Sequence, residues 1–157
     1  MQYRMKTHPL SFDKQEALLG RSQTAVLSTL NADGSPYTTP IHYVWLDGVV
    51  YFHGLPKGQK IDNILRDGRA CFCVYEMQDL LLDSEGKPCD TNTKYESIIA
   101  QGQCALVTDT EEKLRILGKI VEKYTPHLSG TVLPEPMVKG TAVVRFAVSE
   151  LTGKYYD

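Results

Sequence analysis

Hydrophobic and polar residues alternate along several short stretches of the chain, as they do in β-strands with one buried face. Strands are predicted at residues 25–30, 37–46, 49–53 and 70–75, at about 95–107, and at 140–148. Turn-forming residues lie between the early strands. A cluster of them occupies residues 31–36, and Asp47-Gly48 is a hairpin signal. Strands joined by such short turns pair antiparallel with their neighbours.

Apolar residues recur at helical spacing in several segments between these strands. The spacing predicts a short helix at about residues 14–20, a second at 60–66, and a third that ends near Tyr124, before Pro126. Residues 1–11 show neither period and are expected to form an irregular arm. Because helices do not alternate regularly with strands, we expect one mainly β domain over residues 1–157. Its predicted architecture is a six-stranded antiparallel barrel with peripheral α-helices.

The second predicted strand contains Pro40, which has no N–H group to donate to a neighbouring strand. A proline is therefore expected at a sheet edge, at a bulge, or where something other than a strand lies alongside. Side chains alternate along a strand, so Thr38, Pro40 and His42 share one face, and Thr39 and Ile41 share the other. The first face offers a ligand a hydroxyl, an imidazole and free backbone groups. An edge strand with a polar outer face would show the same pattern.

Residues 49–66 are predicted to form a strand, a glycine-containing turn and a helix. The first N–H groups of a helix have no partner within it, and the helix dipole is positive at that end, so an anion is stabilised there. Gly58 allows a ligand to approach the backbone, Lys60 supplies a positive charge, and His53 supplies a further donor. A phosphate ester fits this arrangement. The alternative interpretation is a strand end, a turn and a solvated lysine.

Composition and charge narrow the classes of partner. The 157 residues include 17 basic and 19 acidic side chains, so the net charge is −2, and we expect no nucleic-acid or membrane-surface partner. No stretch approaches the roughly 18 apolar residues of a membrane span, and the N-terminus lacks the apolar core of a signal peptide. The four cysteines lack the spacing of a metal site and suit the reducing cytoplasm. We therefore expect a cytoplasmic protein that binds a small molecule and no metal.

Several short motifs, taken in order and spacing, resemble the FMN-binding split-barrel family related to pyridoxamine 5′-phosphate oxidase. The closer likeness is to its nitroimidazole-resistance (Nim-like) branch, and it covers most of residues 12–150. The motifs are Leu27-Ser28-Thr29, Gly34-Ser35-Pro36-Tyr37 with Pro40-Ile41, the turn Tyr51-Phe52-His53-Gly54 with Gly58 and Lys60, and the strand Tyr95-Glu96-Ser97-Ile98-Ile99-Ala100-Gln101-Gly102.

The resemblance implies a split barrel that forms a homodimer, with FMN in clefts between the subunits. It implies that residues 38–42 line the flavin ring through backbone groups, that His53 and Lys60 hold the phosphate end, and that Ser97 adds a hydroxyl contact. It names no catalytic residue. The implied cofactor-binding residues are Thr38, Thr39, Pro40, Ile41, His42, Phe52, His53, Gly58, Gln59, Lys60 and Ser97.

The function that this resemblance implies is an FMN-dependent oxidoreductase, which passes electrons from NAD(P)H to a small acceptor such as a nitroaromatic compound. A flavin carrier or sensor without turnover needs the same phosphate site and is the alternative; a haem-binding role is a more distant one. Oxidation of vitamin B6 is not expected, because the tail Gly153-Lys154-Tyr155-Tyr156-Asp157 lacks the basic C-terminal motif of the true oxidases.

Overall fold

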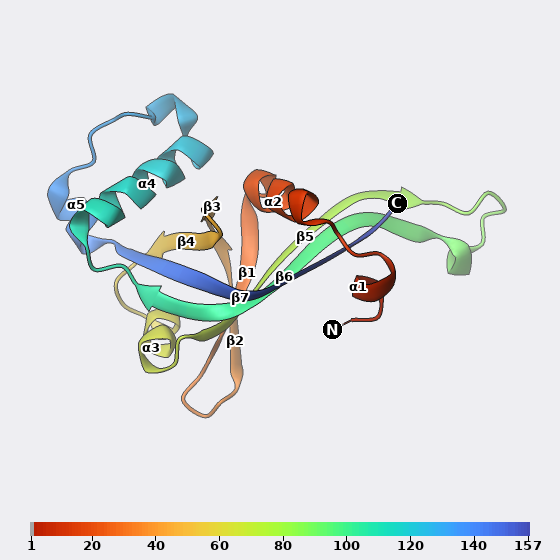
Figure 1. The fold of residues 1–157 in the computed structure, drawn as a ribbon, viewed down its shortest axis with the longest axis horizontal. Helices are drawn as coiled ribbons and strands as arrows, with labels where there is room; N and C mark the ends of the chain where they lie inside the picture. The colour runs from red at the N-terminus through yellow and green to blue at the C-terminus, as the bar shows by residue number, and fades with distance from the viewer. Residues whose placement is uncertain (1) are drawn as a thin grey trace.

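The computed structural model describes residues 2–157, and its centre is a seven-stranded antiparallel sheet with the strand order β2-β1-β5-β6-β7-β4-β3 (Figure 1). The sheet twists strongly, so that β1 and β2 cross the long strands β6 and β7 at a steep angle in Figure 1. This is the split-barrel architecture. The strands are β1 Thr24–Leu30, β2 Pro36–His42, β3 Val44–Leu46, β4 Val49–Gly54, β5 Arg69–Leu81, β6 Asn92–Leu106 and β7 Ala142–Tyr156.

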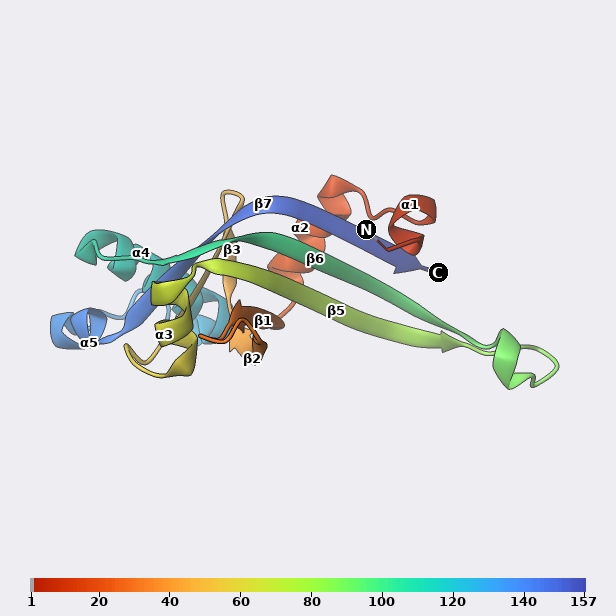
Figure 2. The ribbon, with the colours of Figure 1, turned by 90° about the horizontal axis from the view of Figure 1, so that it is seen from below.

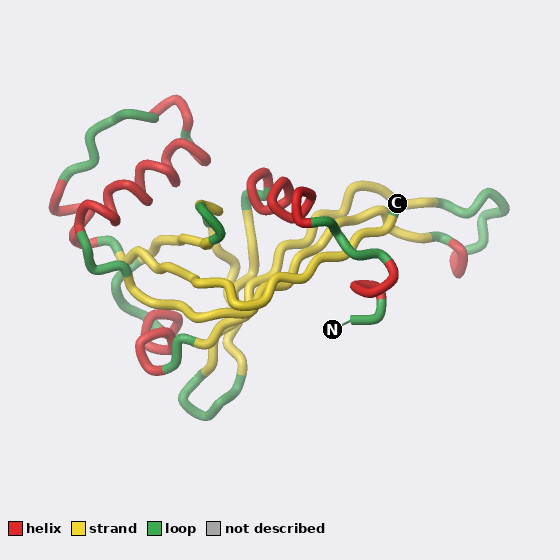
Figure 3. The backbone as a smooth tube through the Cα atoms, in the orientation of Figure 1, coloured by secondary structure: helices red, strands yellow, loops and turns green. Residues whose placement is uncertain are grey.

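Helices lie at the periphery of the sheet, as the tube in Figure 3 shows. α3 packs against β1 and β6, whereas α4 packs against β3, β4 and β7. The helices are α1 Arg4–Thr7, α2 Phe12–Arg21, α3 Gln59–Arg66, α4 Thr110–Tyr124 and α5 Glu135–Gly140, with short 3-10 turns at η1 Pro88–Asp90 and η2 Pro126–Leu128. None of the helices in the described part of the chain has the length and apolar character that a membrane-spanning helix needs.

The main hydrophobic core fills the inside of the curved sheet. Phe72 is fully buried there, and the ring of Tyr43 contacts it edge-on with the ring centroids 5.0 Å apart. Along β4 the side chains alternate, so Phe52 points into this core while Tyr51 points into a smaller cluster beneath α4. The same alternation places the side chain of His53 on the α4 side of the sheet.

The predicted strand 37–46 is two strands, so the prediction of six strands was wrong. β2 and β3 are separated by Tyr43, whose backbone N–H donates to the hydroxyl oxygen of Tyr124 at 2.9 Å instead of to a strand. The hydroxyl of Tyr43 donates to the carbonyl of Leu19 at 2.9 Å. These bonds fasten the break in the strand to α4 and α2, and neither partner is close in the sequence.

The two ends of the chain are more regular than predicted. The polar tail continues β7 as far as Tyr156, which lies opposite Tyr95 of β6. Part of the expected irregular arm is α1, and the arm then runs along β7, where the N–H of Leu10 donates to the carbonyl of Gly153 at 3.0 Å. β5 and β6 also extend beyond the predicted ends and form a hairpin that projects away from the other strands (Figure 2).

Gly102 lies opposite a bulge in β7, because Gln101 pairs with Glu150 and Gly102 with Val148, which leaves Ser149 as the extra residue. A Cβ atom on Gly102 would lie 2.1 Å from the carbonyl oxygen of Ala147. The two strands therefore approach each other at a distance that only glycine permits.

We predict that Gly102→Ala lowers the free energy of unfolding by about 1–3 kcal/mol or more, because backbone atoms cannot move aside as a flexible side chain would. Urea unfolding followed by circular dichroism measures the change. The matched control is Gly118→Ala in α4, where an added Cβ meets nothing within 4 Å. That substitution should raise stability by about 0.5–1 kcal/mol. Equal effects of the two substitutions would contradict the assignment.

Candidate anion-binding site

The turn between β4 and α3 holds an open helix N-terminus. Gly58 has φ 116° and ψ 166°, a conformation that is essentially restricted to glycine. Its carbonyl oxygen accepts the N–H groups of Ile61 and Asp62 at 2.9 and 3.0 Å, which starts α3. Within residues 2–157 no side chain caps this helix. The N–H groups of Gln59 and Lys60, which have no partner among the described residues, are therefore free to bind an anion.

Lys60, in that first turn, is a half-buried cation without an acidic partner. Its Nζ lies 5.2 Å from the ring centroid of Phe52, over the end of the core. Burial lowers the pKa of Lys60 below its usual value. Cys104 is close enough to interact with it, but burial raises the pKa of that thiol to about 12, so the thiol is neutral at pH 7. No ion pair of the described residues includes Lys60.

His53 interacts electrostatically with both His42 and Lys60, and we call these three residues the cationic cluster. Partial burial lowers the pKa of His53 most, and positive charge on His42 and on Lys60 lowers it further. The ring of His42 stacks against Tyr124 of α4, with the centroids 4.9 Å apart. β2 also contacts β4, although these strands are not neighbours in the sheet.

Gln59 is occupied by a contact within the chain. Its side-chain amide donates to Oδ1 of Asn31 at 2.8 Å, and Asn63 donates to the same oxygen at 3.0 Å and to Oγ1 of Thr29 at 3.1 Å. These bonds fix α3 to the turn between β1 and β2. Sequence reasoning missed Asn63, which is 2% exposed; the available signal was an asparagine next to the inward-facing Ile64.

The remaining residues of β2 lie as the alternation predicted. β2 is an edge strand, which is one of the three positions expected for Pro40. Ile41 is buried in the core, and Pro40 lies on the opposite face, where it pairs with Val26 of β1. Thr38 lies on the same outer face and is hydrogen-bonded to Ser28, with the two hydroxyl oxygens 2.8 Å apart. Thr39 falls on the inner face.

Ser97 is not beside His53 and Lys60 within one chain. It lies on β6 seven residues before Cys104, the neighbour of Lys60, and at about 3.3 Å per residue this separation is roughly 23 Å. It is 6% exposed, and in the described structure its hydroxyl has no hydrogen-bond partner. Ser97 pairs with Tyr75 near the projecting hairpin, whereas Cys104 lies opposite Phe146, which pairs with Val50 of β4.

Ser97 and Pro40 nevertheless share one sheet face, which we call the outer face. Pro40 pairs with Val26, Val26 with Cys73, and Cys73 with Ile99, two residues after Ser97. Large apolar side chains are exposed along this face: Val26 is 42%, Tyr75 58% and Met77 52% exposed. The predicted cofactor residues are therefore divided. His42, His53 and Lys60 form the cationic cluster, and Thr38, Pro40 and Ser97 lie on the outer face. Thr39, Ile41 and Phe52 face the inside of the sheet instead.

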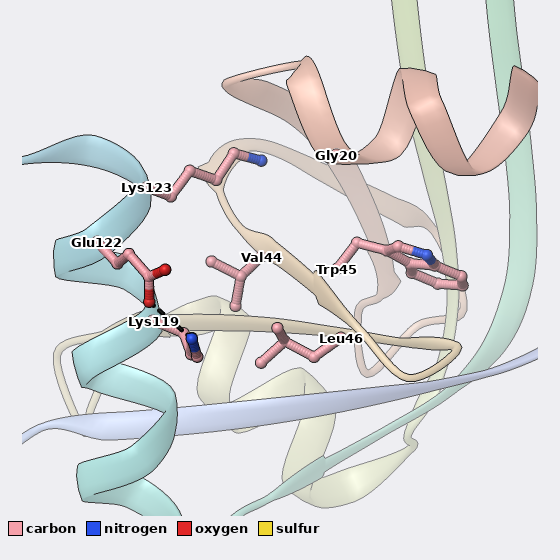
Figure 4. Close-up of a pocket in the computed structure, with 7 residues that line it drawn as sticks. All are labelled: Gly20, Val44, Trp45, Leu46, Lys119, Glu122 and Lys123. Atoms are coloured by element: carbon pink, nitrogen blue, oxygen red, sulfur yellow. Dashed lines mark hydrogen bonds and ion pairs between the residues drawn. The ribbon is translucent and has the colours of Figure 1, made fainter. Parts of the chain in front are cut away.

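A different hollow, between α4, β3 and the end of α2, contains none of the predicted residues (Figure 4). Lys123 donates to the carbonyl of Ser22 at 2.7 Å, and its Nζ lies 4.2 Å from the ring centroid of Tyr43. Burial lowers the pKa of Lys123 to about 8. Lys119 pairs with Glu122 at 2.7 Å. These charged groups are already paired with one another or with the backbone. We therefore interpret the hollow as a packing junction between α4, β3 and α2, and not as a ligand site.

The sequence profile of the family described as pyridoxamine 5′-phosphate oxidase matches residues 13–155, so the chain belongs to this family. This match confirms the resemblance that the motifs indicated. None of the curated proteins matches the chain.

Solved structures share the fold at low sequence identity. A putative 5-nitroimidazole antibiotic resistance protein from Bacteroides thetaiotaomicron has a TM-score of 0.82 and 22% identity, over 93% of this chain and 85% of that one. The flavocytochrome Anf3 from Azotobacter vinelandii has a TM-score of 0.86 and 19% identity, over 99% of this chain and 72% of that one. An FAD and heme binding protein from Mycobacterium smegmatis has a TM-score of 0.84 and 14% identity, over 94% and 72%.

We predict that nuclear magnetic resonance titration gives His53 a pKa below its ordinary value of 6.5. Lys60→Met should raise that pKa, because it removes a positive charge that disfavours the imidazolium. As the pH falls below 6.5, His53 takes up a proton more readily in the unfolded chain than in the folded protein. The contribution of His53 to stability is therefore present above pH 6.5 and is lost below it. Lys57→Met, at an exposed lysine of the same turn, is the control. If Lys60→Met left the pKa unchanged, the cationic cluster would not exist.

Proposed function

We propose that the protein is an FMN-dependent oxidoreductase that uses NAD(P)H to reduce a small acceptor. The observation that carries the proposal is the cationic cluster. A half-buried lysine without a carboxylate partner stands beside a histidine and an uncapped helix N-terminus. Each of these groups is stabilised by a bound phosphate, which carries up to two negative charges at neutral pH.

The residues of the cationic cluster suit the binding of a flavin phosphate better than a purely structural role without a ligand. Lys60 loses hydration without gaining an ion pair, which is unfavourable until an anion binds. Gly58 leaves open space where a Cβ would stand, so a ligand can approach the backbone there. Family membership and the flavin- or haem-binding proteins with the same fold support the same interpretation.

The cofactor site that we propose lies between two copies of the chain. Ser97 has a buried hydroxyl without a partner, and within one chain it is roughly 23 Å from the neighbour of Lys60. It can contact a flavin held by the cationic cluster only from a second copy. The exposed apolar side chains of the outer face, around Val26, Tyr75 and Met77, supply a surface for that association.

In this proposal each group of residues has a distinct task. The cationic cluster holds the phosphate, and the backbone of the edge strand β2 positions the ring. The flavin, when bound, supplies the electron transfer itself, and the protein supplies orientation, charge and the exclusion of water. A nitroaromatic acceptor is the class that the nitroimidazole-resistance neighbour suggests.

Reduction of the bound flavin tests the proposed reaction. We expect purified protein loaded with FMN to lose its flavin absorbance when NADH or NADPH is added without oxygen and without another reductase. Absorbance should return when a nitroaromatic acceptor is added. A spectrum that stays unchanged with both nicotinamide donors would contradict the reductase and favour a flavin carrier.

The phosphate assignment makes a sharper prediction. Lys60→Ala removes a charge-assisted contact worth on the order of 1.5–3 kcal/mol, so FMN affinity should fall roughly tenfold to a hundredfold. Riboflavin, which has no phosphate, should bind almost as it does to the unchanged protein. Lys57→Ala is the matched control, because that lysine belongs to the same turn and is exposed. Equal losses for FMN and riboflavin would show that Lys60 does not contact the phosphate.

Association and flavin binding should be coupled, because a ligand held by two chains stabilises the dimer. Light scattering at micromolar concentration should return twice the chain mass of 17.6 kDa. Val26→Lys places a charge in the outer face and should weaken both the dimer and FMN affinity. Leu65→Lys, which alters a 66% exposed leucine of α3 away from that face, is the control. A flavin-loaded monomer would refute the shared site.

A further inference from the structure

A pocket of about 190 Å³ lies between β4, α4 and α5, and His53 forms part of its wall. The other wall residues carry no charge. α4 contributes Leu117 and Val121, α5 contributes Met137 and Val138, and the segment between these helices contributes Leu133. This chemistry differs from that of the cationic cluster, although the two sites share His53.

The pocket excludes charged ligands and suits a flat apolar group. None of its wall residues could compensate a buried charge, apart from His53 when it is protonated, and partial burial keeps the pKa of His53 low. Thr141 is the other polar residue of the wall, and its hydroxyl donates to the carbonyl of Met137 at 2.8 Å. Apolar walls with a few polar groups that fix orientation are typical of small-molecule sites. A cavity of about 150 Å³ with such walls can hold a benzene ring, so 190 Å³ is sufficient for one aromatic ring.

We infer that this pocket binds a small, uncharged aromatic ring, with a hydrogen-bonding atom directed to His53. The relation of this ring to a bound phosphate rests on the proposed function. The pocket and its binding of a ring do not depend on it. Met137 favours an aromatic group over an aliphatic one, because a thioether makes favourable contacts with ring edges. Met137 is 66% exposed, so a ligand can reach it without opening the core.

Two sources could supply such a ring. One is the base of a nucleotide cofactor whose phosphate lies on the cationic cluster, and the other is the acceptor molecule. The shared position of His53 is compatible with both. Adenosine and nitrobenzene separate them, because each carries one of the two kinds of ring and neither carries a phosphate.

The first experiment uses the full chain without added flavin, labelled at the methionine methyl groups and observed by nuclear magnetic resonance. The Met137 resonance should shift in a saturable way with adenosine or with nitrobenzene, and the responding compound identifies the source. Met77 on the outer face is an internal control and should not shift. No shift with either compound, or equal shifts of Met137 and Met77, would overturn the inference.

The second experiment adds a charge to the pocket. Met137→Lys should weaken binding of the responding compound at least tenfold, because the exposed site tolerates lysine but the bound ring does not. Val132→Lys places the same charge on the same segment at an 87% exposed position outside the pocket, and should have no effect. Equal losses in both variants would contradict the site. Because neither experiment needs FMN, a protein that failed to bind FMN would refute the proposed function and leave the pocket to be judged separately.

Discussion

Antiparallel pairing along β5, β6 and β7 is the constraint on which the rest of the structure depends. These three strands have 13, 15 and 15 residues, and at one end they belong to the barrel. At the other end β5 and β6 form the projecting hairpin, and β7 pairs with β6 as far as Tyr156. Such long strands must bend to enclose a core, and the bulge at Ser149 of β7, opposite Gly102, provides a bend, with the backbone of Ala147 in close approach to Gly102. The bent strands bring β4 and α3 to one end of the sheet, where the cationic cluster forms.

In the proposed dimer, the cationic cluster of one copy and the outer face of the other form a single site. A half-buried cation without a counter-ion and a buried hydroxyl without a partner are both unfavourable in an isolated chain. The proposed ligand, which spans the two sites, would relieve both. The apolar pocket beside His53 adds a third chemical environment at the same end of the sheet, so phosphate and ring recognition can be tuned separately.

Local signals in the sequence predicted the structural features that depend on residues close together in the chain. Pro40 was compatible with an edge strand, and the helical spacing that ends near Tyr124 indicated α4, which ends at that residue. Contacts between distant segments could not be predicted in this way. Tyr124 divides the predicted strand at Tyr43 from 81 residues away. The polar tail forms a strand because it pairs with β6, and the local sequence of the tail does not indicate that pairing.

The central claim is that the cationic cluster binds the phosphate of a flavin, and the protonation of His53 tests it most directly. A bound phosphate next to His53 stabilises the imidazolium, so saturation with FMN should raise the pKa of His53 measured by nuclear magnetic resonance. Saturation with riboflavin fills the ring site without a phosphate and should leave that pKa close to its value in the free protein. The same pKa with FMN, with riboflavin and without ligand would contradict the claim.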